Sequence, residues 1–275
     1  TDGRHPDAVS FGDAEADAQR RDFTVNGLFL DPETGQVIDY VDGLKDLNAR
    51  VLRAIGDPGE RFREDHLRLL RAARFAGILG FTVDPATADA VRRDAALLPK
   101  VAPERIQQEL SKMLLSPRRA DALRACSDLG LLPHFLPEIE TMKGVEQPPE
   151  YHPEGDVFLH TMLCVEKLPA DASLTLALGG LLHDVAKPAT FERADRIRFN
   201  NHDRVGAAMA RDILERLKYP NAVRERVEYL VAEHLRWKDT PKMKVSTLKR
   251  FLASEGWGEL LALYVADCQA SHGKL

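Results

Sequence analysis

The sequence predicts a mainly helical protein that carries one short β-hairpin near its N-terminus. Apolar residues recur at helical spacing through most of the chain beyond Asp57, whereas residues 23–41 alternate as strands do. The chain has 275 residues, of which 44% are hydrophobic. This is enough apolar material for a sizeable core and corresponds to about two domains.

The β-hairpin is predicted from three consecutive segments. "FTVNGLFL" at residues 23–30 and "VIDYV" at residues 37–41 are rich in β-branched and aromatic residues, and "DPETGQ" between them has the composition of a turn. Asp42 and Gly43 follow and close the hairpin. We therefore expect two antiparallel strands in this region.

From Asp57 onward the spacing of apolar residues becomes helical. "GDPGERFREDHLRLLRAARFAGILGF" predicts one long amphipathic helix that stops at Gly80. Further helices are expected near residues 85–96, 103–115 and 117–129, then near 156–168, 172–186, 203–217, 221–234 and 243–253, and from Gly258. The proline-rich stretch "LLPHFLPEIETMKGVEQPPEYHP" separates the two groups and indicates a domain boundary.

Composition excludes several classes of protein. The apolar runs are too short to span a bilayer, and no signal peptide is recognisable. Cys126, Cys164 and Cys268 are far apart, so they form neither a disulfide framework nor a zinc knuckle. We therefore expect a soluble, cytoplasmic protein without a membrane partner. The sequence does not indicate its oligomeric state.

Charge is distributed unevenly along the chain. The segment 47–124 holds 15 Lys and Arg against 10 Asp and Glu, a net charge of +5, which leaves −10 for the rest of a chain whose total is −5. A basic middle in an acidic chain is a candidate surface for phosphates. On charge alone, a solvated helical face explains the segment equally well.

Histidine and aspartate recur in the C-terminal half in a pattern that indicates a metal site. In "LLHDVAK", at residues 181–187, His183 stands beside Asp184 directly after an apolar run, where burying both groups is costly unless something pairs with them. Five predicted helical segments together supply four imidazoles and two carboxylates: His160, His183, Asp184, His202, His234 and Asp267. Such a set suits divalent first-row metals. The alternative is a group of unrelated core and surface histidines.

The order His…His-Asp…His…His…Asp resembles the HD-domain phosphohydrolase superfamily, an all-helical metal-binding fold. The resemblance implies that His160, His183, Asp184 and Asp267 hold one metal, and that His202 and His234 complete a second site with Asp184 as the bridge. Mn, Ni, Fe and Co all remain open as the metal. Such a pair of metals can activate a water and neutralise a phosphate ester.

Three residues near this set are interpreted separately. Lys187 lies about one helical turn after the His-Asp pair and could meet a phosphate, but an ordinary solvated lysine is the favoured interpretation. His152 and His272 flank the set and fit no position in the pattern.

The N-terminal half carries motifs of a different chemistry. "RRDFTVNGL" at 20–28, "IDYVDGLKDL" at 38–47 and "RFREDHLRLLRAARF" at 61–75 occur in that order. Together they resemble tRNA nucleotidyltransferases and bacterial poly(A) polymerases, in particular the bacterial and eukaryotic class of CCA-adding enzymes. Gly27 stands where Ala is commoner in this motif. Some members of the family continue into an HD domain, as this chain does.

An Asp–Arg pair can distinguish nucleotide bases without a template. Asp65 and Arg68 are three residues apart on one predicted helix, so we expect them to project together. A carboxylate accepts from an exocyclic amine, and a guanidinium donates to a ring nitrogen or carbonyl. Cytosine and adenine present an amine beside a ring acceptor, whereas uracil and guanine present the reverse order. One such pair can therefore select C and A.

The resemblance implies the remaining nucleotide contacts. Asp65 and Arg68 would read the base, Arg71 and Arg74 would help to bind the nucleotide from the same helix, and Arg21 would contact it from the RRDFT motif. Asp22 would order that loop, whereas a structural role explains Arg20 equally well and both interpretations stay open for Asn26. The alternative for Glu64, Asp65, Arg68 and Arg71 is a surface ladder of ion pairs.

The carboxylates that perform nucleotidyl transfer are missing from the sequence. In this family an Asp-x-Asp after a Gly-Ser turn binds Mg²⁺, and the chain contains neither string. We therefore expect a piece of a longer protein, with the Mg²⁺ site outside it. The expected domains are the C-terminal part of a nucleotidyltransferase head (1–54), a helical neck and body that bind nucleotide and RNA (55–145), and an HD domain with an incomplete C-terminus (146–275).

The sequence thus favours a mainly α fold, with a hairpin left from an incomplete α/β head, in an enzyme that adds C and A to the 3′ end of tRNA from CTP and ATP. Its HD module would hydrolyse phosphate esters. Two other functions stay open at this point. One is a metal-dependent HD phosphohydrolase that acts on phosphate esters of RNA ends or nucleotides, and the other is a non-catalytic RNA-binding protein.

Overall fold

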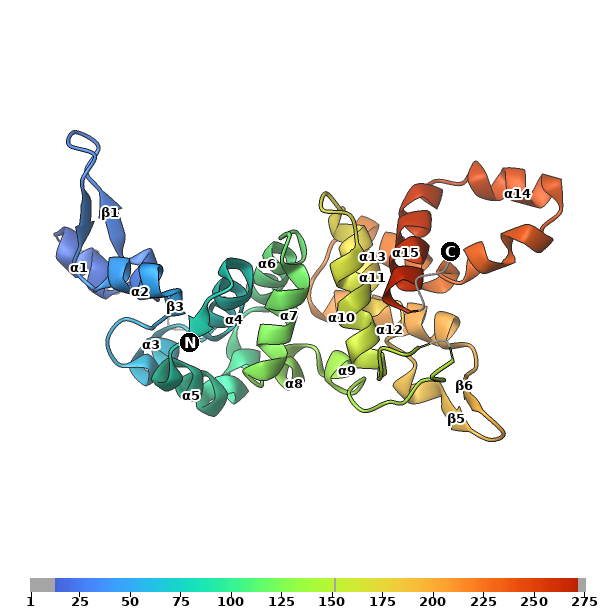
Figure 1. Cartoon of the computed structure of the whole chain (residues 1–275), viewed down its shortest axis with the longest axis horizontal. Helices are drawn as coiled ribbons and strands as arrows, with labels where there is room; N and C mark the ends of the chain where they lie inside the picture. Colours follow the sequence, from blue (N-terminus) through green and yellow to red (C-terminus); the bar gives the residue numbers. More distant parts are fainter. Residues whose placement is uncertain (1–12, 151, 272–275) are drawn as a thin grey trace. The chain divides into compact units, whose positions relative to one another are not determined.

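The computed structural model describes residues 13–150 and 152–271, and it confirms a mainly helical fold (Figure 1). Backbone contacts divide the chain into two units. The first unit comprises Thr1–Glu109 and Asp121–Phe135, and the second comprises Leu110–Ala120 and Leu136–Leu275. The division into three domains expected from the sequence stays a prediction. In the part of the chain that is described, no helix is both long and apolar enough to cross a membrane.

The predicted β-hairpin is present, but its first strand is shorter than expected. β1 (Leu28–Leu30) pairs antiparallel with β2 (Val37–Asp39), with Leu28 opposite Asp39. Thr24–Asn26 forms a 3₁₀ turn instead of strand. The reason is the Asp22 side chain, which accepts hydrogen bonds from the Phe23 N–H and from the Asn26 amide and so holds the chain in a turn.

The predicted helix over 57–80 is broken in two. α3 (Pro58–Glu64) and α4 (Leu67–Leu79) are separated at Asp65, whose backbone is extended. The Asp65 Oδ1 accepts from the N–H of Leu67 at 3.1 Å, as a capping side chain does at a helix start. The expectation that Asp65 and Arg68 share one helix is therefore wrong. Asp65 precedes the helix that carries Arg68.

Helix α4 is the centre of the first unit. Its buried face includes Leu69 and Leu70, and Gly77 lies directly against Ala122 of α7 (Arg119–Asp128). A Cβ at Gly77 would overlap the backbone of Ala122, so glycine permits the close approach of the two helices. The other elements of the first unit are α1 (Ala14–Gln19), α2 (Gly43–Ala49), β3 (Val51–Leu52), β4 (Thr82–Val83), α5 (Pro85–Asp94), a 3₁₀ helix over Ala95–Lys100, the first turns of α6 (Pro103–Leu114), and α8 (Leu132–Phe135).

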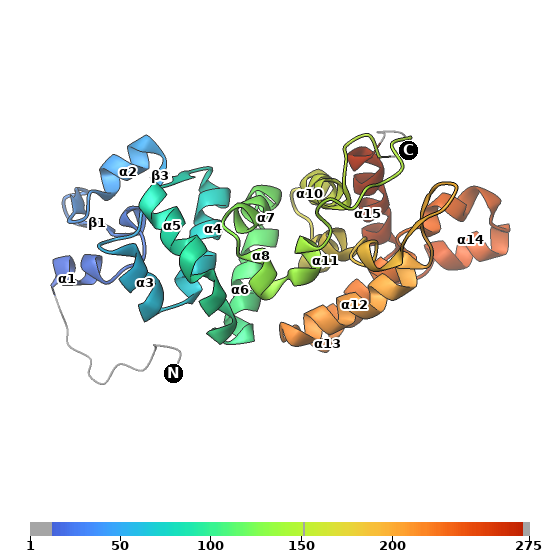
Figure 2. The ribbon, with the colours of Figure 1, turned by 90° about the horizontal axis from the view of Figure 1, so that it is seen from below.

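The second unit is a packed group of helices. Helices α10 (Val157–Lys167) and α11 (Leu174–Leu182) pack on α15 (Trp257–Ala270), and α12 (His202–Arg216) runs beside α13 (Asn221–Glu233), as Figure 2 shows. The two shorter helices of this unit are α9 (Pro137–Glu140) and α14 (Val245–Leu252). The hairpin of β5 (Phe191–Arg193) and β6 (Ile197–Phe199) was not predicted, because its strands are three residues long and carry little alternation.

Candidate metal centre and nucleotide-binding pocket

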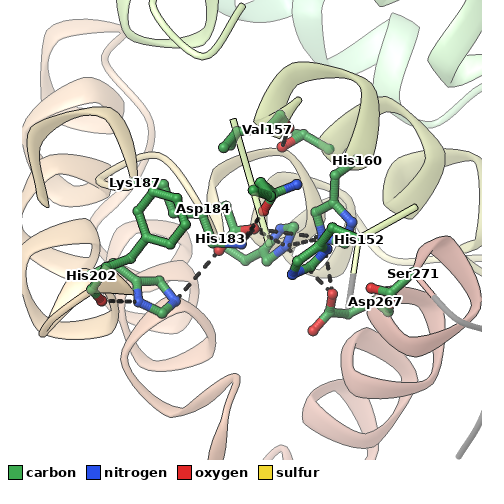
Figure 3. Close-up of polar contacts among 12 residues, drawn as sticks. His152, Val157, His160, His183, Asp184, Lys187, His202, Asp267 and Ser271 are labelled. Carbon is green, nitrogen blue, oxygen red and sulfur yellow. Dashed lines mark hydrogen bonds and ion pairs between the residues drawn. The ribbon is translucent and has the colours of Figure 1, made fainter. Parts of the chain in front are cut away.

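The packing of the second unit brings the six predicted metal ligands together. His160 comes from the middle of α10, His183 and Asp184 directly follow α11, and His234 directly follows α13. His202 is the first residue of α12, and Asp267 lies on α15. Figure 3 shows five of these side chains converging from the surrounding helices: His160, His183, Asp184, His202 and Asp267.

All four imidazoles are held through Nδ1. The Nδ1 atoms of His183, His202 and His234 lie 2.7–2.9 Å from the carbonyl oxygens of Gly180, Phe199 and Val231, each three residues earlier. The Nδ1 of His160 lies 2.6 Å from Glu154 Oε1. Because a carbonyl or carboxylate oxygen only accepts, each Nδ1 carries the proton and each Nε2 is the atom that faces the centre.

The two oxygens of Asp184 face different imidazoles. Oδ2 lies 3.2 Å from His183 Nε2 and 3.6 Å from His160 Nε2, whereas Oδ1 lies 3.5 Å from His202 Nε2 and 3.9 Å from His234 Nε2. Asp267 joins the first pair, with its Oδ1 3.0 Å from His160 Nε2. Asp184 thus lies between two pairs of imidazoles, His160 with His183 and His202 with His234.

The electrostatics of the centre suit divalent cations. His160, His183, Asp184 and His234 are each at most 2% exposed. Burial lowers the pKa of His234, and the neighbouring His183 lowers it further, to about 4, so this imidazole is neutral. Burial alone would raise the pKa of Asp184, but His183 and Lys187 outweigh it and hold that pKa well below its usual range.

The carboxylates around His160 favour positive charge at this imidazole. Burial alone would lower the pKa of His160, but the bonds to Asp267 and Glu154 and the charge of Asp184 raise it to about 9. The oxygens around its Nε2 therefore favour positive charge at that point. A bound divalent cation would supply that charge and displace the proton. Neutral imidazoles with fixed tautomers and ionised carboxylates fit a divalent transition metal.

Lys187 is buried, whereas the sequence favoured an ordinary solvated lysine at this position. It is 6% exposed, and its Nζ lies 2.7 Å from Asp184 Oδ2 and 2.6 Å from Gln147 Oε1. The reason is that the helix ends before the His-Asp pair, and the following turn directs the lysine inward. Lys187 therefore lies at the metal centre.

A cavity of about 670 Å³ opens onto this centre. Its wall joins four of the predicted ligands, Asp184, His202, His234 and Asp267, to basic and apolar side chains of the β5–β6 hairpin and α15 such as Arg196, Phe199 and Tyr264. His152, which fitted no position in the sequence pattern, also lines it, and His272 lies outside the described residues. The mixture of cations and aromatic rings suits a phosphate ester that carries an organic group.

The first unit contains a second, polar pocket of about 390 Å³. All but one of the predicted nucleotide-binding residues line this pocket. The full lining is Arg21, Asp22, Asn26, Asp65, Leu67, Arg68, Arg71 and Arg105. Arg74 is not in this lining. It is 12% exposed and pairs at 2.5 Å with Glu109, which is 3% exposed. The Arg74 guanidinium is therefore already engaged in an ion pair with Glu109.

Arg105 on α6 is the pocket residue that the sequence reasoning missed. Its Nη2 lies 2.9 and 2.7 Å from the two oxygens of Asp65. Burial alone would raise the pKa of Asp65, but Arg105 and the Leu67 N–H lower it, so Asp65 is an ionised acceptor. The Nη1 of Arg105 is buried without a hydrogen-bond partner among the described residues. A lone arginine in "PERIQQEL" gave little signal of this role.

The other arginines of the pocket are held by ordered partners. Arg68 pairs with Glu64 at 2.7 Å and donates to the carbonyl of Arg20 at 3.0 Å. Arg71 pairs with Asp22 at 2.6 Å. Arg21 donates to the carbonyl of Asn26 at 2.7 Å. The RRDFT loop and the start of α4 therefore form one preorganised wall, in which Asp22 orders the loop.

The fold places a polar pocket lined by arginines in one helical unit and a cluster of imidazoles and carboxylates in the other. Three family models match the chain: "Poly A polymerase head domain" over residues 1–53, "Probable RNA and SrmB- binding site of polymerase A" over 80–143, and "HD domain" over 152–267. Most of the chain is therefore similar to the tRNA nucleotidyltransferase and poly(A) polymerase family, and residues 152–267 match the HD domain family.

Curated relatives align with nearly the whole chain. The chain is 39% identical over 272 residues to the A-adding tRNA nucleotidyltransferase of Deinococcus radiodurans, and 34% identical over 267 residues to the multifunctional CCA protein of Vibrio parahaemolyticus. Both alignments cover 94% of this chain but only 61% and 64% of the relatives. The chain thus spans about three fifths of the length of these relatives.

Solved structures share the fold. The CCA-adding enzyme of Bacillus stearothermophilus in complex with CTP matches with a TM-score of 0.69 and 25% identity, over 94% of this chain and 56% of that one. A tRNA nucleotidyltransferase complexed with a primer tRNA and an incoming ATP analog matches with a TM-score of 0.62 and 20% identity, over 95% and 71%. The second match supports the fold alone.

Proposed function

We propose that this chain is the base-selecting neck and HD module of an enzyme that adds C and A to the 3′ end of tRNA from CTP and ATP. The observation that carries the proposal is the convergence of Asp65, Arg68, Arg71 and Arg21 on one polar pocket. The relatives named for A addition and CCA addition support the same reaction class. Mg²⁺, held by carboxylates that this sequence does not contain, would serve the transfer step.

The pocket can select bases even though Asp65 and Arg68 are not on one helix. Oδ1 of Asp65 already accepts from the Leu67 N–H and from Arg105, whereas Oδ2 accepts from Arg105, so the second lone pair of Oδ2 can accept from the amine of C or A while Arg105 holds the carboxylate. Arg68, fixed by Glu64 and the Arg20 carbonyl, would donate to the adjacent ring acceptor. Arg71 and Arg21 would balance the charge of the phosphates, and Arg74 would support α4 through Glu109.

The metal centre would make the HD module a hydrolase of phosphate esters at RNA ends or on nucleotides. His160, His183, Asp184 and Asp267 would hold one divalent transition metal, and His202 and His234 the other, with Asp184 shared. The metals would polarise the phosphate and activate a water. Lys187 would meet a phosphate oxygen, and the cavity would take the organic group.

The proposed partner is the acceptor end of tRNA. The basic segment 47–124 would hold its phosphates independently of sequence. A cytoplasmic location fits an enzyme that processes tRNA.

Nucleotide binding to this chain tests the proposal. In calorimetric titrations, wild type should bind CTP and ATP more tightly than UTP and GTP. Asp65→Ala removes the acceptor for the amine, which should cost about 1–3 kcal/mol of this discrimination. The matched control is Asp89→Ala, because Asp89 is an exposed carboxylate on α5. If wild type and Asp65→Ala show the same preference for CTP and ATP over UTP and GTP, Asp65 acts only as an ion-pair partner of Arg105.

A second candidate function is phosphohydrolysis without nucleotide addition. The cluster of imidazoles and carboxylates beside the cavity favours it, since all six predicted ligands lie within the described residues. Hydrolysis of a phosphodiester by a protein that shows no base preference would support this function. A protein that binds no metal and shows no preference among the bases would instead be a non-catalytic RNA-binding protein.

A further inference from the structure

Glu154 is a buried carboxylate beside the metal centre that does not belong to the predicted ligand set. Its side chain is 6% exposed. Its Oε1 lies 2.6 Å from Nδ1 of His160 and 2.9 Å from Nδ1 of His152, and the two rings meet edge to face with centroids 4.8 Å apart. One oxygen therefore contacts two imidazoles, of which one is a proposed ligand and the other lines the cavity.

His160 differs from the other three histidines in what holds it. His183, His202 and His234 are oriented by carbonyls of their own helices or turns, which are fixed by the local backbone. In α10 the carbonyl three residues before His160 belongs to Val157, and no such bond is formed. A side chain from the preceding loop takes this role instead.

The contacts of Glu154 are those of a hydrogen-bond acceptor and not of a metal ligand. His152, Glu154 and His160 lie close enough to hold an ion as a group. However, a metal 2.0–2.2 Å from both a nitrogen and an oxygen in tetrahedral geometry separates them by roughly 3.3 Å. The observed 2.6 and 2.9 Å are hydrogen-bond distances.

We propose that Glu154 is the positioning residue of the metal centre. It accepts the Nδ1 protons of His160 and His152, turns Nε2 of His160 toward Asp184 and Asp267, and fixes His152 in the cavity wall. The assignment rests on the metal centre proposed above. Carboxylates that orient histidine ligands in this way typically contribute 10–100-fold in metal affinity.

Metal titration of the whole chain tests this assignment. Calorimetry with Mn²⁺ or Co²⁺ should give a dissociation constant about 10–100-fold weaker for Glu154→Ala than for wild type. Glu154→Gln should stay close to wild type, because its amide oxygen still accepts from both rings. The amide nitrogen would replace Oε2, which has no partner among the described residues and so loses no bond. Glu150→Ala is the control, since Glu150 is exposed in the same loop.

Thermal unfolding of the metal-free variants separates positioning from a general structural role. A lower unfolding temperature with unchanged metal affinity in Glu154→Ala would overturn the assignment, as would equal losses in the Ala and Gln variants. Where Glu154→Ala does not fold, Glu154→Asp replaces it, since it withdraws the carboxylate by one methylene and should weaken binding. Wild type that binds neither metal would contradict the proposed metal centre itself, and the assignment with it.

Discussion

At the scale of single residues, the position of Asp184 is unusual for a carboxylate because it is buried. Its side chain is 2% exposed, yet it faces four imidazoles and the Lys187 ammonium. A carboxylate can remain ionised in such a place because His183 and Lys187 favour its charged form. In the metal centre proposed above, its two oxygens would serve two metals.

Replacing Asp184 by Ala should remove metal and activity together. Bound Mn²⁺ or Ni²⁺, measured by elemental analysis after loading and desalting, should fall by at least the 10–100-fold in affinity that a supporting residue contributes. Hydrolysis of bis(p-nitrophenyl) phosphate should be lost. Stability of the metal-free chain should also fall, by about 3 kcal/mol, because Lys187 is left buried without its anion.

The control for this substitution is Asp212→Ala, which removes an exposed carboxylate from α12 of the same unit. It should keep both metal and hydrolysis. An Asp184→Ala protein that retains wild-type metal content would show that this carboxylate is not a ligand.

At the scale of elements, the break between α3 and α4 determines the nucleotide pocket. An uninterrupted helix would place Asp65 and Arg68 one turn apart on the same surface. The break instead turns the Asp65 carboxylate toward Arg105 of α6, while Arg68 and Arg71 remain on α4. The segment at Asp65, helix α4 and helix α6 therefore all line the pocket, and the packing of α4 fixes the distances between them.

The contact between α4 and α7 makes a direct prediction for stability. In an open helix, Gly→Ala stabilises, by about 0.4–1 kcal/mol. At Gly77 the added methyl group would overlap the backbone of Ala122, so Gly77→Ala should lower the free energy of unfolding by about 1–3 kcal/mol. Urea denaturation measures both effects.

The matched substitution is Gly258→Ala in α15, where an added Cβ would meet no atom within 4 Å. It should leave stability unchanged or raise it. If Gly77→Ala is as stable as Gly258→Ala, the two helices do not approach as closely as described here.

At the scale of the whole molecule, two chemistries reside in separate units. The nucleotide pocket lies within the first unit, and the metal centre and its cavity lie within the second. Substitutions in one site should therefore leave the ligand affinity of the other site unchanged. The carboxylates for nucleotidyl transfer belong to neither site.

This chain by itself should not extend tRNA. Because the sequence contains no Asp-x-Asp, no carboxylate pair is available to hold Mg²⁺ at the 3′-hydroxyl and the triphosphate. The measurement is incorporation of labelled CTP or ATP into tRNA that lacks its CCA end, with a CCA-adding enzyme as positive control. Clear incorporation would show that other carboxylates of this chain perform the transfer.

The sequence by itself determined the class of fold, the resemblance to a family and most residues of both candidate sites. Helical spacing and Pro or Gly boundaries are local signals, so the helices and the β1–β2 hairpin could be predicted from them. The HD pattern and the RRDFT motif named residues that the structure brings together in two places. Those residues are recognisable because their types and order are unusual.

Tertiary structure decided what depends on contacts between distant segments. The break at Asp65 and its pairing with Arg105, forty residues away, have no local signature. The burial of Lys187 and the role proposed for Glu154 follow from how loops pack against α10 and α11. Likewise, Arg74 of α4 forms its ion pair with Glu109 of α6, across a helix interface. Periodicity reports which face of a helix is apolar, but the partner of a buried charge is set by the packing of the whole unit.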